Sequence, residues 1–329
     1  MHLLFLCSSL WRYGRDQRPK IILYLSLASL AMLAQLALPL VMAQLMSAIQ
    51  HLQGAELAQR ATHLAGAYAA LGVLFWMLHG PSRVLECQVA FEVKRSFQLS
   101  LLKKVTELPM KWHRDHHSGQ IIDQIAKASG SLSEFAECGF EVLHLVARFV
   151  GSLAILGYLM PKAALAMLAV TLLVVVSIRL FDRPLIAQYD QLNTGNNLVA
   201  AAIQDYLTNI STVISLRLEQ RVCGEVAGRI DAMRPLFGRN IVLNEWKWFT
   251  TSRLIDFCQV GLLLLLILQA EKLEVGQVYA VSEYLRSLGE VFFNVTWKYG
   301  QLVMQSTKVG AVEPILETHR QLVPSQGPD

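Results

Sequence analysis

Two groups of ionisable side chains stand within apolar stretches of the sequence, each at helical spacing. Charged groups in apolar surroundings are costly unless they pair with one another or face a polar cavity. Their chemistry is therefore either ion pairing or contact with a polar or anionic part of a ligand. One group is Glu141, His144 and Arg148, at i, i+3 and i+7, and the other is Glu283, Arg286 and Glu290.

A third group, His113, His116 and His117, lies beside Asp115. Three neighbouring imidazoles could bind a metal ion, but no other ligand type is fixed nearby except Asp115. We interpret the cluster as a polar surface and assign no metal site.

The composition indicates which elements must carry these residues. Of the 329 residues, 53% are hydrophobic and only 16% are charged, which is too apolar for an ordinary soluble domain. The net charge of +4 is small and indicates no nucleic-acid partner. We therefore expect an all-α integral membrane protein in contact with lipids.

Six segments contain the ~20 apolar residues that a helix needs to cross a bilayer. A soluble helical bundle is disfavoured because Gly261 to Leu268 has no polar face. The predicted spans are Ile21 to Ile49, Ala61 to Val84, Phe140 to Met160, Ala163 to Phe181, Leu254 to Ala270 and Val275 to Tyr299.

The predicted domains are an amino-terminal helix in 1–19, a six-helix transmembrane domain in 20–310 and a linker in 311–329. We expect the first to be an amphipathic elbow helix lying along the inner membrane surface. Its lipid-facing residues would be Leu3, Leu6, Leu10 and Trp11, with Arg12, Arg15 and Arg18 facing headgroups.

The distribution of basic residues predicts the orientation, because short loops rich in Lys and Arg stay in the cytoplasm. The three predicted outer loops contain only Arg60, Lys162 and Lys272 of the 29 basic residues. Both termini are therefore expected in the cytoplasm, and the expected location is a bacterial inner membrane.

This topology places several charges roughly 15 to 23 Å from the outer surface, near the middle of the bilayer. Structural pairing is favoured, because acids and bases are nearly equal in number. Contact of Arg148 and Arg286 with a cargo stays open as the alternative. The candidate cavity residues are Arg148, Asp256, Glu283, Arg286 and Glu290.

The two inner connections are far longer than the outer ones. Apolar residues recur in them at helical spacing, so the membrane helices are predicted to continue beyond the bilayer. One helix over Ala61 to Glu107 would be ~70 Å long, more than twice the hydrocarbon thickness. Reversals are predicted at Met110 to Ser118 and Asp205 to Leu218, and bends at Pro184 and Thr194 to Asn197.

At these reversals the sequence resembles the transmembrane domain of ABC exporters, which include lipid flippases and multidrug transporters. In residues 102–122, Leu108, Pro109, Trp112 and Gly119 match the first coupling helix, in which a leucine-proline pair precedes an aromatic residue, a polar stretch and a glycine. Residues 203–220 are similar to the second coupling segment. Gly276-Gln277-Val278 resembles the start of the sixth helix.

The resemblance implies that both reversals contact ATP-hydrolysing domains, the second one in the partner subunit. The partner would be a second copy or a homologous half-transporter. The expected ATPase-coupling residues are Pro109, Trp112, His113, Gly119, Tyr206, Leu207 and Ile210.

The sequence contains no G-x-x-x-x-G-K-[ST] phosphate loop, so no catalytic residue is assigned in this chain. No cofactor is expected here, whereas ATP and Mg are expected in a nucleotide-binding domain. That domain would follow Asp329 in a longer half-transporter or belong to a separate chain.

The expected function is export of an amphipathic or lipid-like compound by alternating access, driven by ATP. An ion-gradient-driven secondary transporter would explain the buried charges but not the long helical extensions. A non-transporting membrane scaffold or regulator is the other alternative.

Overall fold

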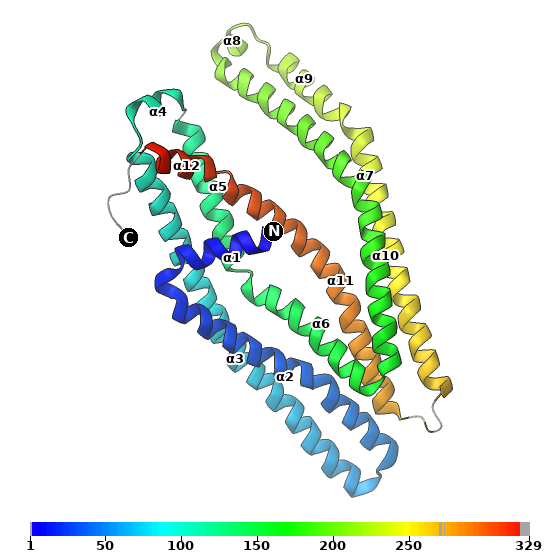
Figure 1. The fold of residues 1–329 in the computed structure, drawn as a ribbon. Coiled ribbons are helices and arrows are strands. Elements are labelled where there is room, and N and C mark those ends of the chain that lie inside the picture. The colour runs from blue at the N-terminus through cyan, green and yellow to red at the C-terminus, as the bar shows by residue number, and fades with distance from the viewer. Residues whose placement is uncertain (1, 117, 270–271, 273, 323–329) are drawn as a thin grey trace. The chain divides into compact units, whose positions relative to one another are not determined.

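The protein is almost entirely helical (Figure 1). A computed structural model describes residues 2–116, 118–269, 272 and 274–322. Within these ranges the chain contains no β-strand, which confirms the predicted all-α fold class. The helices form two compact units, one from residues 1–164 and 265–329 and the other from residues 165–264.

The first unit is built around a long helical hairpin. α2 (Arg18–His51) follows the short helix α1 (His2–Tyr13) and a 3-10 turn, and it packs along α3 (Gly54–Thr106) (Figure 1). The other helices of this unit are α4 (Met110–Asp115), α5 (Ser118–Ala136), α6 (Gly139–Leu159), α11 (Val275–Gly310) and α12 (Glu313–Leu322).

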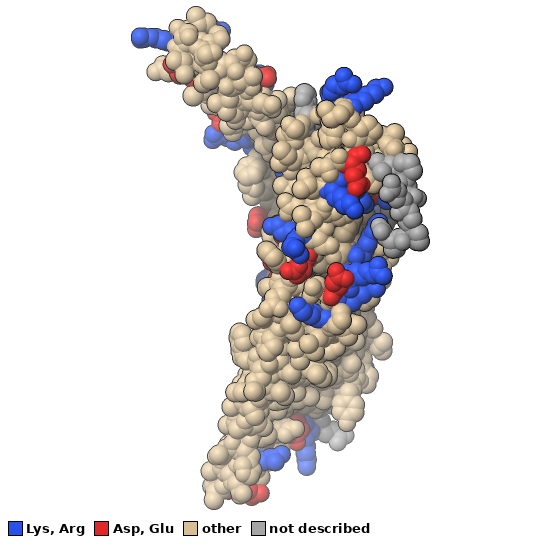
Figure 2. All heavy atoms as spheres, turned by 90° about the vertical axis from the view of Figure 1, so that its left-hand side faces the viewer, with Lys and Arg blue, Asp and Glu red and all other residues tan. Residues whose placement is uncertain are grey.

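The α2–α3 hairpin has an uncharged belt. No Lys, Arg, Asp or Glu occurs from Ile21 to Gln50 or from Ala61 to Ser82. These stretches are ~45 and ~33 Å long at 1.5 Å per residue, enough to cross the ~30 Å hydrocarbon core of a bilayer. Figure 2 shows the consequence, a long part of this face almost without charged side chains and a few charges at its far end.

The second unit consists of α7 (Pro161–Thr208), α8 (Ile210–Ser215), α9 (Glu219–Ala232) and α10 (Arg234–Gln269), of which α7 begins and α10 ends in the first unit. α7 is a single helix of 48 residues that contains Pro184. The bends predicted at Pro184 and at Thr194 to Asn197 therefore do not interrupt it. Thr194 instead bonds its hydroxyl to the Asp190 carbonyl at 2.9 Å, so its polar group is satisfied within the helix.

Five stretches of helix in the described chain are long and apolar enough to cross a membrane. They contain α2, α3, α6, α7 and α10, and thus five of the six predicted spans. α11, which carries Glu283, Arg286 and Glu290, is not among them. α10 ends at Gln269, and Ala270, the predicted end of that span, lies outside the described residues.

Both predicted continuations beyond the bilayer are helical. α3 has 53 residues, so it is ~80 Å long at 1.5 Å per residue, and no break separates its apolar part from its charged end. The chain reverses at α4 in the first case and at α8 in the second, within the segments predicted for the reversals.

One extended buried cluster of the first unit joins α1, α2, α3, α4, α5, α11 and α12. Leu6 on α1 is fully buried in this cluster, and Leu10 packs against it. The prediction that Leu6 faces lipid is therefore wrong, because its side chain covers the protein's own apolar surface, and Leu10 is partly buried against the same surface. Leu3 and Trp11 are exposed, at 41% and 45%.

Candidate functional site

An ion pair joins α6 to α11 in the apolar part of the first unit. Arg148 Nη2 lies 2.9 Å from Glu290 Oε2, and Arg148 Nε donates a hydrogen bond to Ser287 Oγ at 3.1 Å. Ser152, one turn after Arg148, lies 3.2 Å from the same Ser287 hydroxyl. The charged and hydroxyl groups of the two helices are therefore each other's ion-pair and hydrogen-bond partners in low-dielectric surroundings.

A second cation of α11 belongs to the same cluster. Arg286 pairs with Glu283 one turn before it and with Glu290 one turn after it. The side chain of Glu290 is thus shared between Arg148 and Arg286. Arg286 is the most exposed member of this cluster, at 55%, whereas Arg148 is 22% exposed.

A cavity of about 200 Å³ adjoins these charges. Its wall contains polar side chains from α2, α3, α6 and α11, including Gln35, Tyr68, Arg148, Tyr279, Glu283 and Arg286. The side-chain oxygen of Gln35 is buried and has no hydrogen-bond partner within the described residues. The cavity therefore combines paired charges with one unused hydrogen-bond acceptor.

The other ionisable residues of the predicted layer have different partners. Asp256 lies in the second unit and pairs with Arg253 on its own helix at 2.7 Å. Glu141 pairs with Lys298 on α11 and not with Arg148 on its own helix. His144 has Nδ1 2.9 Å from Met32 Sδ.

Sequence reasoning missed the uncharged members of this site. Ser152 could have been found, since it follows Arg148 by four residues on the same helix face. Gln35 and Tyr68 stand alone in apolar segments, and only the packing of α2 and α3 against α6 and α11 brings them to the cavity.

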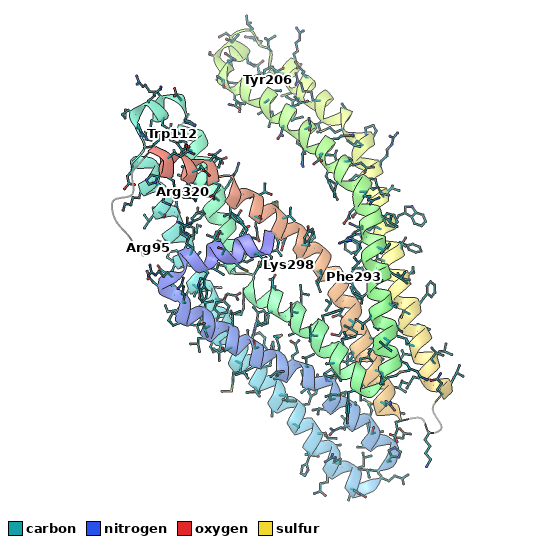
Figure 3. The ribbon with its side chains drawn as sticks, in the orientation of Figure 1. Arg95, Trp112, Tyr206, Phe293, Lys298 and Arg320 are labelled. Carbon is teal, nitrogen blue, oxygen red and sulfur yellow. The ribbon has the colours of Figure 1, made fainter. Side chains whose placement is uncertain are left out.

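The first reversal is anchored by Trp112, which is only 9% exposed. Its ring stacks on His116 at a centroid distance of 4.2 Å and belongs to the same buried cluster as Leu108, Ile315 and Leu316 (Figure 3). Trp112 therefore packs against its own chain, and its ring offers little surface for another protein. The exposed apolar side chain of α4 is Met110, at 75%.

The histidines of this reversal hold its backbone. His113 Nε2 lies 3.1 Å from the Val105 carbonyl, and His116 Nδ1 lies 2.9 Å from the Trp112 carbonyl. His117 lies outside the described residues. Among the described residues, no group of three or more His, Cys, Asp or Glu side chains could hold a metal ion.

The segment expected to be a linker continues as α12 and packs on α3. His319 Nε2 lies 2.7 Å from Glu107 Oε2, at the end of α3 that leads into α4. Pro109 precedes α4 in extended conformation, with φ −62° and ψ 149°. Gly119 is the second residue of α5, and a methyl group added there would meet no other atom within 4 Å. α12 and α4 thus share one buried cluster.

The second reversal presents an apolar surface. Leu207, Ile210, Ile214 and Leu216 are between 44% and 63% exposed. Tyr206 instead donates a hydrogen bond to Glu225 on α9 at 2.6 Å. That bond raises the pKa of Tyr206 and, together with one from Arg229, lowers the pKa of Glu225.

These features define an all-α integral membrane protein whose helices continue beyond the bilayer and reverse at two short segments. The family model for the ABC transporter transmembrane region matches residues 21–289, so this chain belongs to that family. Such regions generally pair with nucleotide-binding domains and act as dimers. No curated protein matches the sequence.

Proposed function

We propose that this chain is the membrane part of an exporter that moves an amphipathic or lipid-like compound by alternating access. The observation that carries the proposal is the length of α3 and α7, which are 53 and 48 residues. At 1.5 Å per residue they are ~80 and ~72 Å long, more than twice the ~30 Å hydrocarbon core. Rigid helices of this length can transmit a movement at their far ends into the membrane.

The driving movement would come from nucleotide-binding domains that bind ATP and Mg. The proposed contacts are the surfaces of the two reversals, with Met110 exposed at the first and Leu207 and Ile210 at the second. Trp112 would stabilise the position of the first surface without contacting the partner domain, since its ring is buried. A second copy or a homologous half would complete the transporter. We place both termini in the cytoplasm and the protein in a bacterial inner membrane.

The cargo would meet the cavity beside the α6–α11 ion pairs. Arg148 and Arg286 line it, and Arg286 keeps more than half of its side chain exposed. A polar or anionic part of the cargo would take the place of Glu290 beside these cations, while Gln35 accepts a hydrogen bond. Retaining paired charges here fits a function better than stability, because burying ion pairs gives little net stabilisation.

The test uses the intact transporter, this chain with its nucleotide-binding domain, in liposomes and a panel of amphipathic compounds. We expect ATP-dependent accumulation of one compound class and stimulation of ATP hydrolysis by that class. Transport driven by an ion gradient without ATP would support the secondary transporter instead. Absence of both activities would support a scaffold.

The cargo contact is tested with Arg148→Ala combined with Arg286→Ala. We expect transport to fall at least tenfold, roughly the effect of one lost charged hydrogen bond. Arg95→Ala, which removes an exposed cation of α3, is the matched control. Intact transport in the double variant, with only a lower unfolding temperature, would restrict these arginines to structural pairing.

A further inference from the structure

A second and larger pocket lies in the first unit, where α5 gives way to α6. Its volume is about 630 Å³, and residues of α3, α5, α6 and α11 line it. It is separate from the cavity beside Arg148, since the two share no lining residue. Neither the family match nor the proposed transport cycle assigns a role to it.

Arg83 and Lys298, the strong cations of this pocket, already form ion pairs within the protein. Arg83 pairs with the buried Glu86 and also donates to the Glu137 carbonyl at 2.9 Å. Lys298 pairs with Glu141, and Figure 3 shows it on α11 beside the start of α6. An incoming anion would have to break these pairs.

Two carboxylates of the pocket have no ion-pair partner within the described residues. Glu134 and Glu137 are exposed, and neither forms an ion pair within the described residues. A third basic side chain of the pocket, His144, directs Nδ1 to Met32 Sδ at 2.9 Å. The free charge in this pocket is therefore negative.

A third acceptor comes from α11. Gln305 lines the pocket with only 5% of its surface exposed, and its side-chain oxygen has no hydrogen-bond partner in the described part of the chain. A buried amide oxygen without a donor costs free energy that a bound N–H group would recover. The unpartnered Gln305 oxygen is independent of the two carboxylates, and it too favours a ligand that donates a hydrogen bond.

We propose that this pocket binds the ammonium group of an organic cation, with Glu134 and Glu137 supplying the charge and Gln305 an acceptor. Trp297 and Phe140 line the same pocket and give the ligand's apolar part a surface, as aromatic rings do for cations. A metal ion fits less well, because no group of three metal-binding side chains occurs in the described residues. The proposal concerns binding and goes beyond the proposed transport function.

The test measures binding of octylammonium to this chain in nanodiscs of zwitterionic lipid, by equilibrium dialysis with empty nanodiscs subtracted. Octylammonium should bind saturably and at least about tenfold more tightly than octanoate, which has a similar alkyl body and the opposite charge. No ATP is involved, so a failure here is distinguishable from a failure of transport. Equal affinity for the two probes would overturn the proposal without any variant.

Variants divide the site into its two parts. Glu134→Gln combined with Glu137→Gln should weaken octylammonium and octyltrimethylammonium alike, by about tenfold. Gln305→Met should weaken only octylammonium, because the trimethylated probe has no N–H to donate. Asp190→Asn combined with Glu219→Gln, which neutralises two exposed acids of the other unit, should leave both affinities unchanged. Wild-type affinity in the Glu134 and Glu137 double variant would refute the site.

Discussion

The buried carboxylate of Glu86 on α3 accepts a hydrogen bond from the backbone amide of Phe140 at 2.7 Å, where α6 begins. The same carboxylate pairs with Arg83, which in turn donates to the Glu137 carbonyl at 2.9 Å, where α5 has just ended. One ion pair of α3 therefore holds both sides of the break between α5 and α6. The hydrogen bonds made by this pair replace backbone hydrogen bonds that are lost where the helix is interrupted.

We expect Glu86→Ala to lower the free energy of unfolding by about 2–3 kcal/mol, because the Phe140 amide loses its acceptor and the Arg83 guanidinium loses its carboxylate partner. Thermal unfolding in detergent micelles, followed by circular dichroism, measures the change. Glu86→Gln should lose less, since its amide oxygen can still accept from Phe140. An unchanged unfolding temperature in Glu86→Ala would show that the break is held by packing alone.

Variants of Trp112 and Met110 distinguish two roles at the first reversal, namely stabilising its fold and contacting another domain. Trp112→Ala should lower the free energy of unfolding by roughly 3–5 kcal/mol, because it removes a buried aromatic from the cluster with Leu316. Met110→Ala should leave the unfolding temperature unchanged, since its side chain is 75% exposed. In the intact transporter Met110→Ala should instead weaken cargo stimulation of ATP hydrolysis. Similar unfolding temperatures for both variants would contradict the anchoring role of Trp112.

The helical architecture could be predicted from the sequence for physical reasons. Membrane helices need long uncharged segments, and the stretch from Ile21 to Gln50 can be recognised as one without any knowledge of packing. Continuation of α3 beyond the bilayer followed from helical spacing of its apolar residues, and both reversals fell within the expected segments. The sixth predicted span, on α11, stays a prediction, because α11 is not among the helices that are long and apolar enough to cross a membrane.

The partners of individual side chains were less predictable. Helical spacing placed Glu141 and Arg148 on one face, yet Glu141 pairs with Lys298 across to α11. Spacing shows which side chains share a face and says nothing of which helix covers it. In the same way, Trp112 was expected at a contact with another domain, yet it is buried in a cluster that includes residues of α12, a segment expected to be a linker.

The hydrogen bond from Tyr206 to Glu225 at the second reversal makes a pH-dependent prediction. The bond lowers the pKa of Glu225, so its stabilising effect is present above the ordinary carboxyl pKa and is lost as the pH falls through the lowered value. Tyr206→Phe should raise the pKa of Glu225 toward its ordinary range, with Arg229 still lowering it in part. Carbon NMR of the Glu225 carboxyl during an acid titration measures the shift.

The matched change for that experiment is Tyr189→Phe, which removes another phenol of the same unit and should leave the Glu225 titration unaltered. The Tyr206–Glu225 bond lies at the exposed surface, so we expect a local change and no shift of the global unfolding temperature. A Glu225 pKa that is the same with and without the Tyr206 hydroxyl would show that the bond does not form in solution.

Gly276, at the start of α11, marks a place where two helices touch at the backbone. A methyl group added there would overlap the Ala43 carbonyl and the Ser47 hydroxyl of α2. A backbone carbonyl cannot swing aside as a flexible side chain can, so Gly276→Ala must push α11 away from α2. We expect a loss of about 1–3 kcal/mol in the free energy of unfolding, measured by thermal unfolding in detergent micelles.

The control for Gly276→Ala is Gly66→Ala, within α3, where a methyl group meets no other atom within 4 Å. Alanine favours a helix over glycine by about 1 kcal/mol, so this variant should unfold at an equal or higher temperature. The two substitutions add the same methyl group, and opposite signs would isolate the close contact as the cause. Since the Arg148–Glu290 pair also depends on the position of α11, Gly276→Ala should reduce transport by the intact protein as well. A stable and active Gly276→Ala variant would mean that α2 and α11 are not in backbone contact during the transport cycle.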